Sequence, residues 1–208
     1  MAIEIAFTLA LVVLVVATYW IALKNSSEKI GRQFQILSER LELQLDQPMP
    51  KMGGFLRPEP SLYGTYRGRE MSISVPGKGL QNTRQIETLL KIGITDKNIS
   101  AQLTATGPLG GLRQRDSGKQ ARWKSGDEKF DNAVDVRTNH GEILCSLLGK
   151  ERRKWLADTL KRSKATLYIG GGNLAYARLG LIGNESTRQD FEAAAEFLCD
   201  LAETIETS

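Results

Sequence analysis

The sequence predicts an α+β protein in which an N-terminal transmembrane helix precedes an antiparallel β-sheet covered by about two helices. Residues 5–23 carry no charge and are mostly apolar. Short segments with alternating apolar residues and turn sequences then follow, which is typical of strands. Longer segments with apolar residues at helical spacing gather towards the end of the chain. Strands in series with helices late in the chain indicate a sheet with helices on one side.

The membrane prediction depends on the run IAFTLALVVLVVATYWIAL, residues 5–23. At about 1.5 Å per residue this run spans roughly the 30 Å of a bilayer's hydrocarbon core. Tyr19 and Trp20 lie near its carboxyl end, where aromatic residues anchor a helix at the membrane interface. A cleaved signal peptide ending near Val15 and Ala17 is one alternative, but the amino end has no basic residue. A buried core helix is the other, and the run lacks the polar face of such a helix.

The residues that flank the apolar run predict its orientation. Lys24, Lys29 and Arg32 follow the run closely, whereas only the α-amino group provides positive charge before it. Because basic flanks stay on the cytoplasmic side, we expect the amino end outside and the C-terminal domain in the cytoplasm. The lipid bilayer is therefore the first expected partner, and the basic flank would contact anionic headgroups.

The two cysteines fit either compartment. Cys145 and Cys199 could be reduced thiols in a cytosolic domain or could form one disulfide in an oxidising compartment. Each lies among apolar neighbours, in ILCSLL and EFLCDL. This pattern favours two buried thiols.

The composition indicates one folded domain of ordinary size after the anchor. The chain has 208 residues, of which 41% are hydrophobic, so it can bury a core and is not disordered throughout. The net charge of +4 is mild and does not indicate nucleic acid as a partner. We assign residues 1–23 to the anchor, 24–47 to a juxtamembrane helix, 48–60 to a linker and 61–208 to the globular domain.

The juxtamembrane helix has one apolar face. Ile30, Phe34, Leu37 and Leu41 recur at spacings of four, three and four. Pro48 prevents the helix from continuing, and the linker has several prolines and a glycine pair. The apolar face is too short to specify a coiled coil alone, although two chains in one membrane could form a homodimer through residues 30–41. Packing on the chain's own domain, or along the bilayer surface, is the favoured interpretation.

The globular domain is expected to begin with strands and to end with helices. A hairpin of strands 62–66 and 69–75 surrounds a turn at Arg67 and Gly68. The other expected strands are residues 85–93, 99–106, 130–138, 165–169 and 174–181, the last two joined by a glycine triplet. Helices are expected over residues 142–148, 151–161 and 187–206.

Two motifs resemble those of a group of uncharacterised bacterial membrane-anchored proteins. Residues 64–73 read GTYRGREMSI and residues 125–131 read SGDEKFD. They are similar to that group's patterns G-x-Y-R-G-R-x-V-x-I and T-G-D-x-x-F-D, with Met71 in place of valine and Ser125 in place of threonine. The resemblance covers about residues 61–206 and implies the domain boundaries. The group has no assigned activity, so the resemblance implies no function.

The first candidate site combines two arginines with two aspartates. Arg67 and Arg69 flank a turn glycine and could bind a phosphate or carboxylate, because guanidinium groups bind such anions bidentately. Asp127 and Asp131 lie four residues apart and could pair for acid–base chemistry or hold a cation. The favoured interpretation is structural: Asp127 closes a turn, Asp131 is solvated, and the arginines are solvated or bond an acidic neighbour such as one of these aspartates.

The second candidate site is a basic stretch between two expected strands. It could bind anionic lipid or nucleic acid, with a tryptophan to stack or insert. Nearby acidic residues dilute its charge, so we favour a solvated loop. Its members are Arg113, Arg115, Lys119, Arg122, Trp123 and Lys124.

Nothing in the sequence indicates a metal, a cofactor or a catalytic centre. His140 is the only histidine and cannot build a multi-histidine metal site. The glycine triplet at 170–172 lacks the lysine of a phosphate-binding loop. Two classes of function remain. We favour a membrane-anchored cytoplasmic interaction or scaffold module with an unidentified protein partner. The alternative is an enzyme or ligand-binding domain with an anion site near Arg67, Arg69 and Asp127.

Overall fold

The computed structural model describes residues 2–55, 57–76, 86–95, 98–107 and 120–207. Its helices are α1 (Ala2–Leu41), the short 3₁₀ helix η1 (Met52–Gly54), α3 (Glu128–Ala133), α4 (Gly141–Leu147), α5 (Lys150–Ser163) and α6 (Glu185–Thr207). Its strands are β1 (Gln44–Asp46), β2 (Ser61–Tyr66), β3 (Arg69–Ser74), β4 (Glu87–Gly93), β5 (Ala101–Ala105), β6 (Ala121–Trp123), β7 (Val134–Thr138), β8 (Thr166–Gly170) and β9 (Asn173–Leu179). The predicted α+β class is confirmed.

The strands form one nine-stranded sheet in the order β1-β2-β3-β4-β9-β8-β5-β7-β6. All pairings between these strands are antiparallel. The β2–β3 turn is formed by Arg67 and Gly68, which both have positive φ angles, 50° and 78°. Two positive φ angles give the turn type whose twist matches the twist of the two strands. The predicted hairpin is therefore confirmed.

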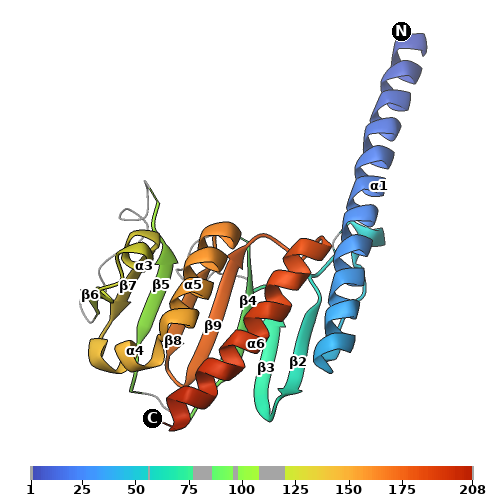
Figure 1. Ribbon diagram of the computed structural model, residues 1–208. Coiled ribbons are helices and arrows are strands. Elements are labelled where there is room, and N and C mark those ends of the chain that lie inside the picture. Colours follow the sequence, from blue (N-terminus) through green and yellow to red (C-terminus); the bar gives the residue numbers. More distant parts are fainter. Residues whose placement is uncertain (1, 56, 77–85, 96–97, 108–119, 208) are drawn as a thin grey trace.

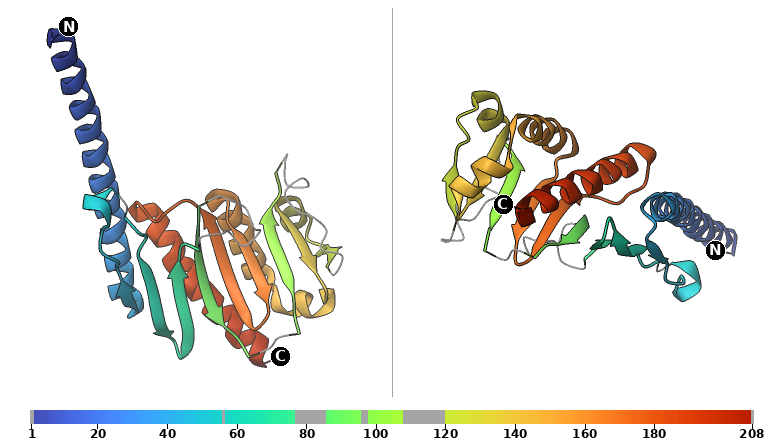
Figure 2. Two further views of the ribbon diagram at one scale, coloured as in Figure 1. Left: turned by 180° about the vertical axis from the view of Figure 1, so that it is seen from behind. Right: turned by 60° about the horizontal axis from the view of Figure 1, so that its bottom comes forward.

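The sheet and its helices make two layers. Helices α3 to α6 lie on one face, and no helix covers the opposite face among the described residues (Figures 1 and 2). The core between the layers includes Leu90 and Tyr176 from the sheet and Phe191 and Leu198 from α6, all nearly inaccessible to solvent. The ring of Tyr176 meets that of Phe191 edge-on at 5.4 Å between centroids.

Helix α1 is continuous from the amino end into the domain (Figure 1). Its N-terminal part is long and apolar enough to cross a membrane, and none of its most apolar stretch is buried. Its C-terminal part packs against α6, β1 and β2. Ile30, Phe34, Leu37 and Leu41 all belong to the domain core. The apolar face therefore packs on the chain's own domain, which was one of the arrangements expected, and a dimer through residues 30–41 would have to displace it.

The end of α1 is defined by local backbone chemistry. Glu42 adopts a left-handed conformation with φ of 53°, which terminates a helix. The Leu43 amide then donates to the Ser38 carbonyl oxygen at 3.0 Å, and Ser38 Oγ donates to the Leu43 carbonyl oxygen at 2.7 Å. The chain turns back and enters the sheet as β1, a strand that the sequence did not predict.

Two further expectations are wrong. Residues 130–133 form part of α3 rather than a strand, because the Asp127 side chain caps the helix by accepting from the Lys129 and Phe130 amides. Only the second half of the expected strand, β7, is extended. Cys199 is buried as expected, but Cys145 is exposed, and both are free thiols.

Candidate functional site

Arg67 and Arg69 pair with carboxylates on the last helix. Arg67 pairs with Asp200 at 2.7 Å and with Glu203 at 2.9 Å, and Arg69 pairs with Glu206 at 2.6 Å. Each guanidinium group therefore has at least one carboxylate partner on α6. The three ion pairs fasten the β2–β3 hairpin to α6 and offset the positive charge of both arginines.

Glu206 is the most strongly bound of these carboxylates. Besides Arg69, it accepts from the Thr95 amide at 2.9 Å and from Thr95 Oγ1 at 3.0 Å. The Arg69 hydrogen bond and the Thr95 hydrogen bonds lower the pKa of the Glu206 carboxyl to about 2. The carboxylate therefore stays charged, and so stays paired, at any pH above this value.

A change of Glu206 to glutamine is expected to make stability less dependent on acid pH. The pKa of Glu206 is lower in the folded chain than its ordinary 4.5, so its contribution is present above about pH 4.5 and disappears as the pH falls towards 2. The melting temperature of Glu206→Gln should be below that of the wild type at pH 7 and equal to it near pH 2. Glu151→Gln, at an exposed position on α5, is the control. An unchanged gap between wild type and Glu206→Gln across this range would contradict the assignment.

Asp127 and Asp131 serve the start of α3. Asp127 is its N-cap, and Asp131 accepts from the Ser125 amide and from Ser125 Oγ, both at 2.8 Å. Hydrogen bonds from Ser125 and Gly126 lower the pKa of Asp131 despite its partial burial. Asp131 is thus hydrogen-bonded rather than solvated, and the suggested pairing with Arg67 or Arg69 is not found. The arginines lie at β2–β3 and the aspartates beside β7, near opposite ends of the sheet.

The basic stretch divides into two parts. Arg113, Arg115 and Lys119 lie outside the described residues. Arg122 and Trp123 belong to β6, where Arg122 Nε lies 2.8 Å from Asp135 Oδ1. Trp123 packs against the domain core rather than standing free. Lys124 follows β6 directly. Of the described members, Arg122 and Trp123 therefore belong to a strand at the sheet edge and not to a solvated loop.

A different candidate site lies where α1 leaves the domain, and sequence reasoning missed it. A pocket of about 360 Å³ opens between α1 and residues 47–60. Its lining includes Leu23 and Ser27 from α1, together with Phe55, Arg57 and Glu59. Burial raises the pKa of the Glu59 carboxyl. The pocket lies directly beside the end of the apolar run.

One hydrogen bond joins residues 47–60 to α1, and a second stabilises the conformation of these residues internally. Trp20 Nε1 donates to the Gly53 carbonyl oxygen at 3.2 Å, and Arg57 Nε donates to the Gly54 carbonyl oxygen at 2.9 Å. The ammonium group of Lys24 lies 5.7 Å from the centre of the Trp20 ring. Trp20, expected only as a membrane-interface residue, is thus also a contact between the apolar helix and the segment after β1. Trp20 and Gly53 are 33 residues apart, so no pattern of neighbouring residues predicts this contact.

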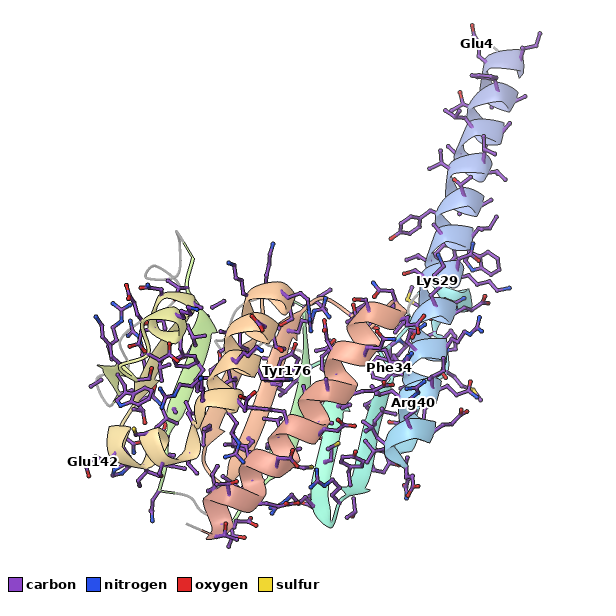
Figure 3. All side chains as sticks on the ribbon, in the orientation of Figure 1. Glu4, Lys29, Phe34, Arg40, Glu142 and Tyr176 are labelled. Carbon is purple, nitrogen blue, oxygen red and sulfur yellow. The ribbon has the colours of Figure 1, made fainter. Side chains whose placement is uncertain are left out.

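Polar contacts add to the apolar packing between α1 and α6. Arg188 Nε donates to Gln33 Oε1 at 3.1 Å, and Arg40 pairs with Glu192 at 3.2 Å. Arg188 also pairs with Glu192. Figure 3 shows Phe34 and Arg40 on the side of α1 that faces α6. The C-terminal part of α1 and the last helix of the domain therefore form one packed unit.

The described residues contain no group of three or more histidine, cysteine, aspartate or glutamate side chains that could hold a metal ion. His140 precedes α4, and its side chain caps no helix. Cys145 is exposed on α4. The junction between α1 and residues 47–60 is thus the site candidate that the structure adds to those expected from the sequence, while Arg67 and Arg69 line a separate open pocket of about 490 Å³ with Glu206.

The fold, but not the sequence, has a known counterpart. The chain is similar to the crystal structure of the mycobacterial trehalose monomycolate transport factor A, TtfA, with a TM-score of 0.50 and 9% sequence identity. The similarity covers 81% of this chain and 96% of that chain. Neither a protein-family model nor a curated protein matches. At this identity the likeness to TtfA shows a common fold alone.

Proposed function

We propose that this chain is a single-pass membrane-anchored interaction module, whose domain is held in a fixed position against the bilayer. The observation that carries the proposal is the continuity of α1. The same helix has a fully exposed apolar N-terminal part and a C-terminal part whose apolar face is buried in the domain core. A helix built in this way transmits the orientation of the membrane span to the domain without a flexible linker.

The exposed part of α1 supports the membrane half of the proposal. Between Ile3 and Ile21 most large apolar side chains are about half exposed or more. A continuous apolar surface of this length is unfavourable in water, and a soluble domain rarely leaves one uncovered. Insertion into a bilayer removes that cost.

The basic residues at the end of the span support a cytoplasmic position for the domain. Lys24, Lys29 and Arg32 follow the apolar run on α1, and Lys29 lies where this helix meets the domain (Figure 3). By the positive-inside rule this end of the helix stays in the cytoplasm. Two free thiols are compatible with a reducing compartment.

The geometry favours an interaction module over the alternative anion-binding domain. Arg67 and Arg69 already have carboxylate partners on α6, and Asp127 caps a helix near the other end of the sheet. TtfA is named as a transport factor for trehalose monomycolate. By analogy of fold we extend to this chain only an accessory role in transport, and we propose no cargo.

A charged residue in the middle of the span should separate the chain from membranes. Leu14 is exposed near the centre of the apolar run, and an arginine there costs about 2.5–3.5 kcal/mol of insertion free energy. Leu14→Arg should therefore shift the ratio of membrane-bound to soluble chain roughly 100-fold in vesicle flotation. Leu14→Phe is the matched control and should float like the wild type. Flotation of Leu14→Arg at the wild-type level would overturn the anchor.

Topology is tested separately from anchoring. A compartment-sensitive reporter fused to the carboxyl terminus should be active in the cytoplasm. Exchange of Lys24, Lys29 and Arg32 for glutamine should reduce that preference, since the positive-inside rule depends on these charges. Reporter activity on the outer side of the membrane in the unmodified chain would refute the proposed orientation.

A further inference from the structure

We propose that residues 49–55, here called the interfacial loop, insert into the same membrane leaflet from which α1 emerges and form a second lipid contact. The interfacial loop contains η1 and joins β1 to β2. It lies beside α1 where that helix leaves the domain (Figures 1 and 2). The inference depends on the proposed membrane anchor and adds a lipid-binding surface that the anchor alone does not require.

The height of the interfacial loop along α1 is fixed by direct contact. The Trp20 side chain donates to the Gly53 carbonyl oxygen. Trp20 precedes Lys24, the first charged residue after the apolar run, by four residues, or about 6 Å along a helix. Phe55 lies further towards the amino end, beside a shallow apolar groove lined by Val16 and Ala17. The loop is therefore level with the last turns of the span and not with the domain below it.

Three large side chains of the interfacial loop are apolar and exposed. Met49 and Met52 are 85% and 79% exposed, and Phe55 is 46% exposed. Among the described residues outside α1, the two methionines are the most exposed large apolar side chains. Flexible methionine side chains and an aromatic ring are well suited to packing against disordered acyl chains.

The backbone of the interfacial loop is prepared for an apolar environment. The carbonyl oxygens of Gly53 and Gly54 accept from Trp20 and Arg57. The Gly54 amide donates to the Lys51 carbonyl oxygen at 3.0 Å, and the Phe55 amide donates to the Met52 carbonyl oxygen at 3.3 Å. Irregular backbone is tolerated near the hydrocarbon layer only when its polar groups are bonded internally. These four bonds satisfy four consecutive carbonyl oxygens, those of residues 51–54, and the amides of Gly54 and Phe55.

The charges around the interfacial loop suit lipid headgroups. Lys51 is exposed within the loop, and Lys24 lies on α1 one turn after Trp20. Long basic side chains can bury their stems in an apolar layer and place the charge among phosphates. We therefore assign the loop to the bilayer itself rather than to a protein partner. A second contact beside the helix would fix the rotation of the domain about the axis of α1.

Depth-dependent quenching in vesicles tests this proposal. The full chain carries Cys145→Ser to remove the exposed native thiol, while the buried Cys199 remains. A fluorophore is attached at a single new cysteine, Met52→Cys, and the protein is placed in vesicles of phosphatidylcholine and phosphatidylglycerol with nitroxide groups on the acyl chains. Tyr19→Cys reports the anchor. Glu142→Cys, on α4 far from the amino end (Figure 3), reports water.

The three probes separate the possible outcomes. Insertion of the interfacial loop predicts quenching at position 52 of at least half that at position 19, with none at 142. Quenching at 19 but not at 52 would overturn the loop contact and leave the anchor intact, as expected if only a protein partner covers the loop. Absence of quenching at both positions would overturn the anchor and the loop contact together. Met49→Ser in the Met52→Cys chain should reduce the quenching, whereas Gln47→Ser at the exposed neighbouring position should not.

Discussion

Replacement of Phe34 by alanine is expected to lower the free energy of unfolding by about 3–5 kcal/mol. Phe34 is fully buried on the face of α1 that packs against α6 and the first strands. Truncation removes an aromatic ring from the core and leaves a cavity that rigid neighbours refill only in part. Urea unfolding of the full chain in mild detergent should show the loss as a lower midpoint with an unchanged slope.

Gln35→Ala provides the matched control for Phe34→Ala. Gln35 is the next residue on α1 and is exposed, with one hydrogen bond of 3.3 Å to Glu39. Alanine is a better helix former, so this change should alter stability by less than about 0.5 kcal/mol. A similarly small effect of Phe34→Ala would show that this part of α1 is not an integral part of the domain core. That result would also remove the observation on which the proposed rigid anchoring depends.

The apolar face of α1 illustrates what the sequence could predict. Helical spacing of Ile30, Phe34, Leu37 and Leu41 identified the buried face correctly. The same spacing fits a dimer, a bilayer surface or the chain's own domain, because periodicity identifies a face but not the surface that covers it. The choice depends on α6, whose contacting residues lie about 150 positions later, as in the pair Arg40 and Glu192.

Among the strands, too, those encoded by adjacent residues were predicted, and those that depend on distant residues were not. The β2–β3 hairpin was predicted because both the turn and the alternation are encoded in adjacent residues. Residues 130–133 were expected to be a strand, on the weak evidence of apolar residues such as Phe130 and Val134. They form a helical turn instead, because the Asp127 side chain caps it. The three-residue strands β1 and β6 are too short to show any alternation. Such strands form because a neighbouring strand is present to pair with them.

For the candidate sites, the sequence identified charged residues but not their partners. Arg67 and Arg69 stood out because they flank a turn glycine. Their carboxylate partners follow 133 to 137 residues later on α6, so the charge compensation was invisible. The junction near Trp20 was missed for the same reason, although the apolar residues Met49, Met52 and Phe55 in a proline-rich segment were a usable signal. Exposed apolar residues in a linker are unusual enough to merit attention.

Replacement of Arg188 by methionine is expected to destabilise the chain by about 3 kcal/mol. The Arg188 side chain is 4% exposed and pairs with Glu192, which is 16% exposed. Removing one partner of a buried ion pair typically costs about 3–5 kcal/mol, because the other charge remains without compensation. Glu192 keeps its pair with Arg40 at 3.2 Å, so the lower end of this range applies. The measurement is the urea midpoint of the full chain in detergent, at two salt concentrations.

The double variant Arg188→Met with Glu192→Leu tests why Arg188→Met loses stability: because a charge is left uncompensated or because packing is lost. It removes both buried charges and keeps most of the volume, so it should recover much of the stability lost in Arg188→Met. An additive loss in the double variant would mean that the two side chains act independently, so that lost packing and not an uncompensated charge explains the effect of Arg188→Met. A loss below 1 kcal/mol for Arg188→Met would contradict the buried-pair assignment altogether.

Arg67 gives the contrast that explains why burial decides these effects. Its side chain is 38% exposed, and its partners Asp200 and Glu203 are more than half exposed. Water screens exposed pairs, so Arg67→Met should lower the urea midpoint far less than Arg188→Met does, despite two short contacts. That small cost should shrink further at high salt, whereas the Arg188→Met effect should persist. The number of ion pairs thus predicts little here, because the burial of each pair decides how much its loss costs.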